Sequence, residues 1–177
     1  SQASLVAALA AGAGFWAGGG ASGAARVALL LGAAVFVQLR LLCNLFDGMV
    51  ALEGGKAGPA GAFWNEVPDR VADVLIFVGA GLGAGAPALG WAAAVMAVAT
   101  AYLRAMGVTL GQPADFGGPM AKPHRMAVMT AAAILACFEP LFGGPGHVVL
   151  RAGLWLVTIG AAVTVLLRAR RLLAALR

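Results

Sequence analysis

Long apolar stretches, separated by short polar or glycine- and proline-containing segments, account for most of the sequence. A helix that crosses a membrane needs roughly 20 mostly apolar residues. Pro87 favours a helix start, and Pro140 with the glycines after it separates the last two apolar stretches. The pattern predicts an all-α polytopic membrane protein with six transmembrane helices, at about residues 3–18, 25–46, 67–85, 88–106, 125–142 and 148–167.

The composition supports lipid as the solvent of this chain. Of its 177 residues, 62% are hydrophobic and only 11% are charged, whereas a soluble domain carries about 25% charged residues. We therefore expect one transmembrane domain over residues 1–177. The first residue is Ser rather than Met, and no cleavable signal peptide is visible, so we expect that the N-terminus is truncated.

The basic residues predict the orientation of the helices. With both termini inside, most of them fall on the cytoplasmic side, as the positive-inside rule requires. These residues are Lys56, Arg104, Lys122, Arg125, Arg168, Arg170, Arg171 and Arg177. Attraction to anionic lipid headgroups accounts for the net charge of +5 without a nucleic-acid partner. The arginines at 168–171 are interpreted as a topological anchor.

Acidic residues concentrate at the junction of the second and third apolar stretches. Five of the seven lie between positions 47 and 73. Ionisable groups at membrane depth are costly and usually mark a functional cavity. Structural ion pairing is the alternative, and it is disfavoured because only Arg40 and Arg70 lie in the neighbouring helical stretches.

Helical spacing places polar residues on two stripes. One stripe holds Arg40, Asn44, Asp47, Gly48 and Ala51. The other holds Asn65, Glu66, Asp69 and Asp73, if the third helix begins by Asn65 with Pro68 in its first turn. Two such stripes facing each other would gather oxygen ligands suited to Mg²⁺ or Mn²⁺. Gly48 and Gly61 would allow the close approach of a diphosphate.

The same residues resemble the signature of the CDP-alcohol phosphotransferases, D-x2-D-G-x2-A-R-x8-G-x3-D-x3-D. The spacing is matched over 26 positions by Asn44-x2-Asp47-Gly48-x2-Ala51-Leu52-x8-Gly61-x3-Asn65-x3-Asp69. Asn44 and Asn65 replace two aspartates, and Leu52 replaces the arginine. The sequence looks like a divergent bacterial branch of this family, whose basic loop resembles Gly118-Pro119-x2-Lys122-x2-Arg125.

The resemblance implies two divalent ions and a carboxylate general base. Asp69 occupies the base position. Because the two asparagines carry no charge, Glu66 and Asp73 are candidates to replace the lost carboxylates, which would shift the assignments by one helical turn. The candidate catalytic residues are Asp69 and Asp73, and the candidate metal ligands are Asp47, Asn44, Asn65, Glu66 and Asp69.

The activity that the resemblance implies is a step of phospholipid biosynthesis. A substituted phosphate would pass from a CDP-linked lipid to an acceptor alcohol, with release of CMP. The implied setting is a homodimer in the bacterial inner membrane, with its active site facing the cytoplasm. The candidate substrate-binding residues are Gly48, Ala51, Gly61, Lys122, Arg125 and Arg104, although positive-inside anchoring explains the last three equally well.

Other functions stay open from the sequence. An intramembrane prenyltransferase also pairs acidic motifs around Mg²⁺, but such enzymes usually have more helices. The substitutions at Asn44, Asn65 and Leu52 keep open a non-catalytic family member or a small transporter. Glycerol phosphate, serine, inositol phosphate and other polyols all remain possible acceptors.

Overall fold

The computed structural model describes residues 2–53, 59–143 and 146–177, apart from the side chains of residues 47–53, 59–62, 65 and 142. The described residues form α-helices joined by turns and loops, with one short 3₁₀ helix. The elements are α1 (Gln2–Gly20), α2 (Gly23–Glu53), α3 (Pro59–Gly83), α4 (Pro87–Thr109), α5 (Lys122–Ala136), the 3₁₀ helix η1 (Glu139–Phe142) and α6 (Val148–Ala175). The predicted all-α fold is confirmed.

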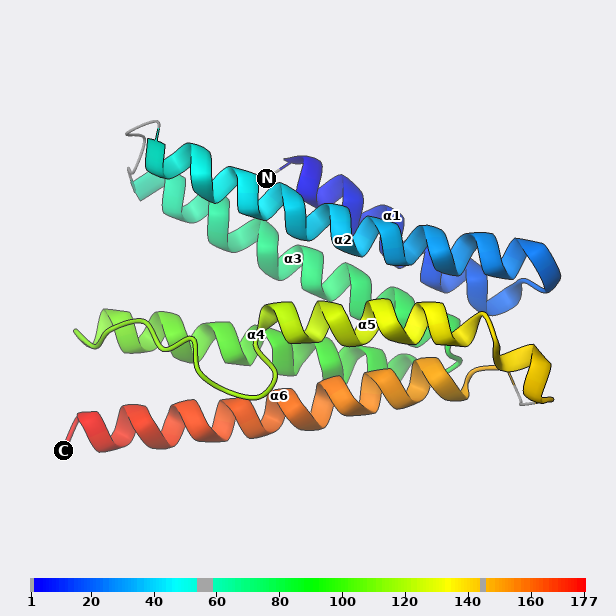
Figure 1. Ribbon diagram of the computed structural model, residues 1–177. Helices are drawn as coiled ribbons and strands as arrows, with labels where there is room; N and C mark the ends of the chain where they lie inside the picture. The colour runs from blue at the N-terminus through cyan, green and yellow to red at the C-terminus, as the bar shows by residue number, and fades with distance from the viewer. Residues whose placement is uncertain (1, 54–58, 144–145) are drawn as a thin grey trace.

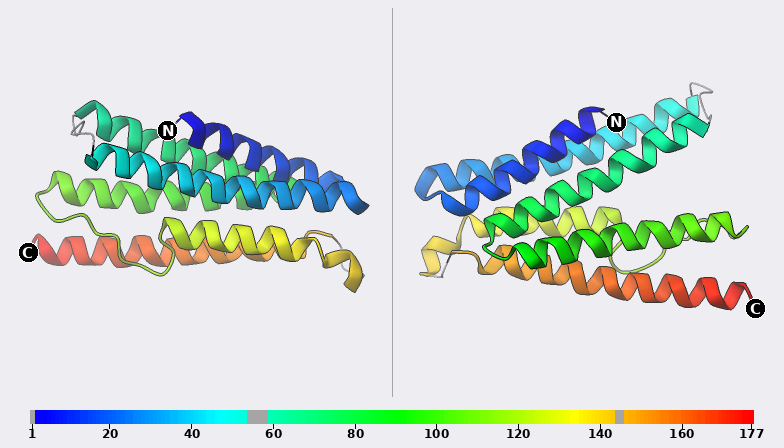
Figure 2. Two further views of the ribbon diagram at one scale, coloured as in Figure 1. Left: turned by 45° about the horizontal axis from the view of Figure 1, so that its top comes forward. Right: turned by 180° about the vertical axis from the view of Figure 1, so that it is seen from behind.

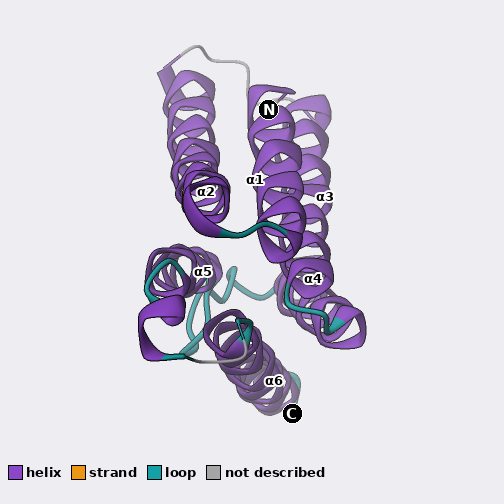
Figure 3. Cartoon of the chain, turned by 90° about the vertical axis from the view of Figure 1, so that its right-hand side faces the viewer, coloured by secondary structure: helices purple, strands orange, loops and turns teal. Residues whose placement is uncertain are grey.

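The six α-helices form a bundle of two layers (Figure 1). Viewed from the end of the bundle, α2, α1 and α3 lie in one layer and α5, α6 and α4 in the other (Figure 3). The layers meet where α3 packs on α4 and α2 packs on α5. Seen from behind, α3 and α4 lie close together near the turn that joins them and separate toward their other ends (Figure 2). The carboxyl ends of α2, α4 and α6 therefore lie at the same end of the bundle as the amino ends of α3 and α5.

Four helices among the described residues are long and apolar enough to cross a membrane. They are α1, the first part of α2 (Gly23–Phe46), α4 and α6. The other two fall short for different reasons. The helix α3 carries four charged residues, Glu66, Asp69, Arg70 and Asp73, and α5 has only 15 residues. The chain is therefore a polytopic membrane protein, and the predicted total of six spans stays a prediction.

Several predicted helix ends are wrong. The helix α2 continues seven residues beyond the predicted end at 46, and α3 begins at Pro59 rather than near Asn65. Pro68 consequently lies inside α3, where it leaves one backbone hydrogen bond of the helix unmade. At the other end of the bundle, α5 stops at Ala136. The 3₁₀ helix follows it and ends at Phe142, directly before Gly143, which has a φ of 64°.

Small residues allow the helices of the first layer to approach closely. A Cβ added to Gly79 of α3 would collide with the backbone of Gly12 in α1. In the same way, a Cβ added to Gly19 of α1 would collide with the backbone of Gly83 in α3. Close backbone contact between small residues is how membrane helices commonly associate. The larger buried side chains, Phe15, Phe77, Ile76, Leu154 and Val157, fill the remaining space between the helices.

A buried ion pair joins three elements at the far end of the bundle. Arg26, near the start of α2, donates to Glu139 Oε2 at 2.8 Å and to the backbone oxygen of Gly146 at 2.5 Å. The other Glu139 oxygen accepts from the backbone nitrogen of Val149 at 2.7 Å. This contact ties α2 to η1 and to the first turn of α6.

Candidate functional site

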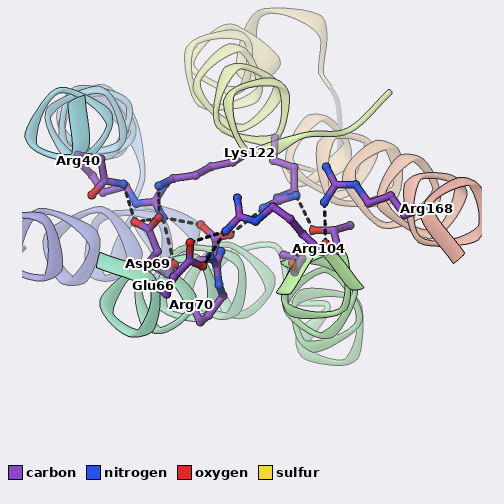
Figure 4. A network of polar contacts seen from close by, with 12 residues as sticks. Arg40, Glu66, Asp69, Arg70, Arg104, Lys122 and Arg168 are labelled. Atoms are coloured by element: carbon purple, nitrogen blue, oxygen red, sulfur yellow. Dashed lines mark hydrogen bonds and ion pairs between the residues drawn. The ribbon is translucent and has the colours of Figure 1, made fainter. Parts of the chain in front are cut away.

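A charged network fills the end of the bundle where α2, α3, α4, α5 and α6 meet (Figure 4). Its three described carboxylates, Glu66, Asp69 and Asp73, lie three or four residues apart on α3. That spacing puts all three on one side of the helix, as predicted, although α3 begins earlier than expected. The cations that contact them come mostly from other helices, namely Arg40, Arg70, Arg104, Lys122 and Arg125.

Asp73 is the most deeply buried carboxylate of the network. Its side chain is 0% exposed, and its two oxygens accept from different helices. Arg40 of α2 donates to Oδ1 at 2.7 Å, and Arg125 of α5 donates to Oδ2 at 2.9 Å. Arg125 is also held by Thr100 Oγ1 at 3.1 Å and by the backbone oxygen of Met120 at 3.0 Å. One carboxylate thus joins α2, α3 and α5.

Asp69 lies one turn earlier on α3 and is closer to the surface, with 13% of its side chain exposed. Its Oδ1 accepts from the side-chain nitrogen of Asn44 at 2.5 Å and lies 3.5 Å from Arg40 Nη2. Its Oδ2 accepts from Lys122 Nζ. Two of the predicted site residues, Asn44 and Lys122, therefore contact the residue at the base position directly.

Glu66 is the most exposed of the three, with half of its side chain open. Arg104 Nη2 lies 2.6 Å and 2.7 Å from its two carboxylate oxygens. Arg70, one turn further along α3, also donates to it. Arg104, a predicted substrate-binding residue, is therefore held beside the site by Glu66.

The expectation that ion pairing would be sparse is wrong. It considered only cations near the carboxylates in sequence, whereas Lys122 and Arg125 lie more than 50 positions beyond their partners. Buried carboxylates require compensation by charge or hydrogen bonds, and helix packing supplies it here from distant segments. Ion pairing and a functional role are compatible for Asp69, because part of this side chain remains accessible.

A cavity of about 330 Å³ opens beside Asp69. Asp69 is the only carboxylate among its described lining residues, whereas five lining residues are cationic: Arg70, Arg104, Lys122, Arg125 and Arg168. Thr100, Phe116 and Pro123 complete much of the wall. Its charge suits a phosphate-bearing ligand, since arginine and lysine are the usual partners of phosphate oxygens.

The segment between α4 and α5 borders this cavity and is held by α6. Arg168 is buried, and it donates to the backbone oxygens of Thr100 at 2.6 Å and Gly117 at 3.0 Å. Thr164 Oγ1 accepts from the Met120 backbone nitrogen at 3.0 Å. The interpretation of Arg168 as part of a topological anchor is therefore wrong. An arginine at the end of a long apolar helix looks the same in sequence whether it faces lipid headgroups or protein.

Asp115 belongs to the same segment and lies near the surface. Burial alone would raise the pKa of its carboxyl, but a hydrogen bond from the Gly117 backbone nitrogen and the nearby Arg171 guanidinium together lower the pKa below its ordinary value. Arg171 Nη1 lies 3.2 Å from Asp115 Oδ2. The carboxylate thus stays charged and keeps this segment bound to α6.

Some predicted site residues lie outside the described side chains. These are Asp47, Gly48, Ala51, Gly61 and Asn65, as well as the variant position Leu52. Among the side chains that are described, no group of three or more His, Cys, Asp or Glu residues is arranged to hold a metal ion. Asp69 and Asn44 are the described members of the predicted ligand set that touch each other.

Two curated relatives of the chain have the same named activity. Over 142 residues, 76% of the chain, it is 32% identical to a phosphatidylinositol phosphate synthase of Streptomyces avermitilis, of which it covers 58%. It is 29% identical to the phosphatidylinositol phosphate synthase of Mycolicibacterium smegmatis, of which it covers 62%. These similarities agree with the resemblance to the CDP-alcohol phosphotransferases that the acidic signature carries.

The chain spans about three fifths of the length of those two relatives. A third relative, the bifunctional IPC transferase and DIPP synthase of Rubrobacter xylanophilus, is 36% identical over 131 residues, although the chain covers only 28% of it. No protein-family model matches the chain.

Solved structures support the same fold. The phosphatidylinositol phosphate synthase of Mycobacterium tuberculosis, in complex with manganese and citrate, matches with a TM-score of 0.76 at 22% identity. The match covers 96% of this chain and 78% of that one. A second structure of that protein, with CDP-DAG bound, matches with a TM-score of 0.74. The six-helix bundle of this chain therefore has the same fold as that synthase.

Proposed function

We propose that the protein is a phosphatidyltransferase of phospholipid biosynthesis, which moves a phosphatidyl group from a CDP-linked lipid to an acceptor alcohol and releases CMP. One observation carries the proposal: Asp69, at the base position of the acidic signature, borders a cavity whose other charged lining residues, among those described, are all cations. The relatives named phosphatidylinositol phosphate synthase, and the CDP-DAG bound to the mycobacterial structure, support this class of donor.

In this reaction the acceptor hydroxyl oxygen attacks the phosphorus that carries the lipid. A new P–O bond forms, the P–O bond to CMP breaks, and the hydroxyl proton passes to a carboxylate. Asp69 is the candidate base because its side chain is partly open and borders the cavity. Asp73 is less suited, because both of its oxygens are held by buried arginines.

The acidic signature is proposed to hold a divalent cation, Mg²⁺ or Mn²⁺. The carboxylates of Asp47 and Asp69, with the side-chain oxygens of Asn44 and Asn65, form the kind of oxygen donor set that these ions prefer. Manganese in the mycobacterial structure supports the assignment. When bound, the cation would neutralise the diphosphate and stabilise charge on the leaving CMP.

The acceptor is proposed to carry a phosphate of its own. The cavity is lined by Arg104, Lys122, Arg125 and Arg168, and the first three are paired with carboxylates. Arg168 donates only to backbone oxygens among the described residues, so its charge is the one that a phosphate on the acceptor would balance. A phosphorylated polyol, the kind of group that appears in the relatives' name, would supply that phosphate.

The test is CMP release by the purified protein from CDP-diacylglycerol, with glycerol 3-phosphate, inositol phosphate or serine as acceptor. We expect release with a phosphorylated acceptor and Mg²⁺ or Mn²⁺, and complete loss of turnover in EDTA. Pyrophosphate release from a prenyl diphosphate would instead support a prenyltransferase. No turnover with any donor would support a non-catalytic family member, and full turnover in chelator would exclude the metal-dependent mechanism.

The proposed topology has six membrane spans. Both termini and the active site face the cytoplasm of a bacterial cell. The four apolar helices and the clustering of basic residues at the site end support this arrangement. Single cysteines introduced at Gln112 and Gly143 should label from the cytoplasmic and outer sides, respectively. Labelling of both positions from the same side would contradict the proposed topology.

A homodimer is proposed from the family resemblance. Native mass spectrometry in mild detergent should give twice the mass of one chain. A monomer that retains full CMP release would contradict this assembly and leave the proposed activity intact.

A further inference from the structure

Lys122 holds the oxygen of Asp69 that a divalent cation or an incoming hydroxyl would need. Its ammonium contacts Oδ2, while Asn44 donates to Oδ1 at 2.5 Å and Arg40 Nη2 lies 3.5 Å from the same oxygen. Both oxygens of Asp69 are therefore engaged by protein donors. The ammonium at Oδ2 opposes a divalent cation by charge repulsion and by the space that it occupies, so a metal binds this carboxylate more tightly when Lys122 moves away.

Lys122 is better placed to move than the other cations of the network. Arg40 and Arg125 are 0% and 2% exposed, and both are fixed by Asp73. Lys122 has a quarter of its side chain exposed, and Asp69 is its one hydrogen-bond partner among the described residues. Its four-carbon stem is flexible and carries a compact charge that can turn between partners.

The cavity offers Lys122 a second partner when it is filled. Lys122 lines the cavity together with Arg104, Arg125 and Arg168. A phosphate placed there would lie among these cations and would attract the ammonium away from Asp69. That exchange would leave Oδ2 of Asp69 free.

We propose that Lys122 and a divalent cation compete for Asp69, and that a phosphate in the cavity relieves the competition by taking Lys122. This inference rests on the proposed metal-dependent function and adds a coupling between its two ligands. Because coupling between binding sites is reciprocal, the phosphate raises the affinity for the metal and the metal raises the affinity for the phosphate. The metal-binding form is thereby favoured when a substrate is present.

The experiment is a titration of the purified full chain in detergent with Mn²⁺, followed by electron paramagnetic resonance, with and without sulfate as a phosphate probe. Protein-free titrations correct for the Mn²⁺ that sulfate binds. Sulfate is expected to raise the Mn²⁺ affinity of the wild type about tenfold, within the range usual for coupled sites. Lys122→Gln should bind Mn²⁺ about tenfold more tightly without sulfate, and sulfate should have no further effect.

Two variants serve as controls. Arg171→Gln removes the same charge from the exposed pair with Asp115 and should leave both the affinity and the sulfate effect close to wild type. Lys122→Arg keeps the charge and should keep Mn²⁺ binding weak without sulfate. Circular dichroism and thermal unfolding establish that each variant is folded before titration.

The outcomes separate this inference from the proposed function. It is wrong if Lys122→Gln binds Mn²⁺ no more tightly than the wild type, if the sulfate effect persists in that variant, or if neither protein binds Mn²⁺. These measurements require no turnover, so an intact coupling without CMP release would contradict only the proposed activity. Repeating the titration with CMP and with glycerol 3-phosphate assigns the phosphate to the donor or to the acceptor.

Discussion

Asp73→Asn is expected to destabilise the folded protein by about 3–5 kcal/mol, the usual cost of breaking a buried ion pair by removing one partner. The side chain of Asp73 is fully buried, and its oxygens balance the charges of Arg40 and Arg125. Asparagine keeps the size of the side chain but leaves Arg125 without a carboxylate partner among the described residues, and leaves Arg40 only its longer contact with Asp69. Because these arginines belong to α2 and α5, the loss would loosen the contact between the two layers.

Thermal unfolding in detergent, together with denaturant titration, measures this loss. Asp115→Asn is the matched control, since it makes the same chemical change in an ion pair that is substantially exposed to solvent. Exposed pairs contribute about 0–1 kcal/mol, so this control should unfold close to wild type. If Asp73→Asn is as stable as the control but has lost turnover, Asp73 acts in catalysis, as the sequence analysis allowed.

A second variant separates lost charge balance from lost packing. Replacing Asp73 with leucine and Arg125 with methionine in the same chain removes one carboxylate and one cation together. Buried ion pairs can often be exchanged for apolar groups at little cost. We expect the double variant to recover part of the stability that Asp73→Asn loses, with Arg40 still able to reach Asp69.

The helices could be predicted because hydrophobic runs of membrane length are a strong local signal. Their ends could not. Hydropathy indicates where a chain leaves the apolar layer of the membrane, and the first charged residue after Phe46 is Asp47. The helix α2 nevertheless continues past Asp47 to Glu53. Pro68 led to a similar error. Because proline is best tolerated in the first turn of a helix, the sequence placed the start of the helix near Pro68, whereas α3 begins nine residues earlier, at Pro59.

The sequence predicted the carboxylates of the candidate site but not the residues that pair with them. Helical periodicity placed Glu66, Asp69 and Asp73 on one side of α3 because the repeat of a helix is local. The partners of these residues depend on which helices pack together, and a single sequence does not contain that information. Arg168 was missed for the same reason, since its contacts are with the α4 backbone and the segment before α5.

Asp69→Asn is expected to lower CMP release by at least about 100-fold, the lower end of the range for a lost general base. Asparagine retains an oxygen for Asn44 and Lys122 but cannot accept the proton of an attacking hydroxyl. Turnover should be measured in a single-turnover assay at saturating metal, so that weakened metal binding does not imitate a slower chemical step. Glu66→Gln, in the more exposed pair with Arg104, should cost about tenfold, on the assumption that Glu66 replaces one of the carboxylates lost at Asn44 and Asn65.

The stability of Asp69→Asn decides whether the lost turnover is chemical. Its unfolding should stay near that of the wild type, because Arg40 retains Asp73 as a partner and Lys122 is partly exposed to solvent. This behaviour is the reverse of that expected for Asp73→Asn, one turn further into the bundle. An Asp69→Asn protein that keeps CMP release within tenfold of the wild type would exclude Asp69 as the base. Catalysis would then have to rest on Asp73, the other candidate base, or on Glu66 or Asp47, and the signature would be shifted in register relative to the family pattern.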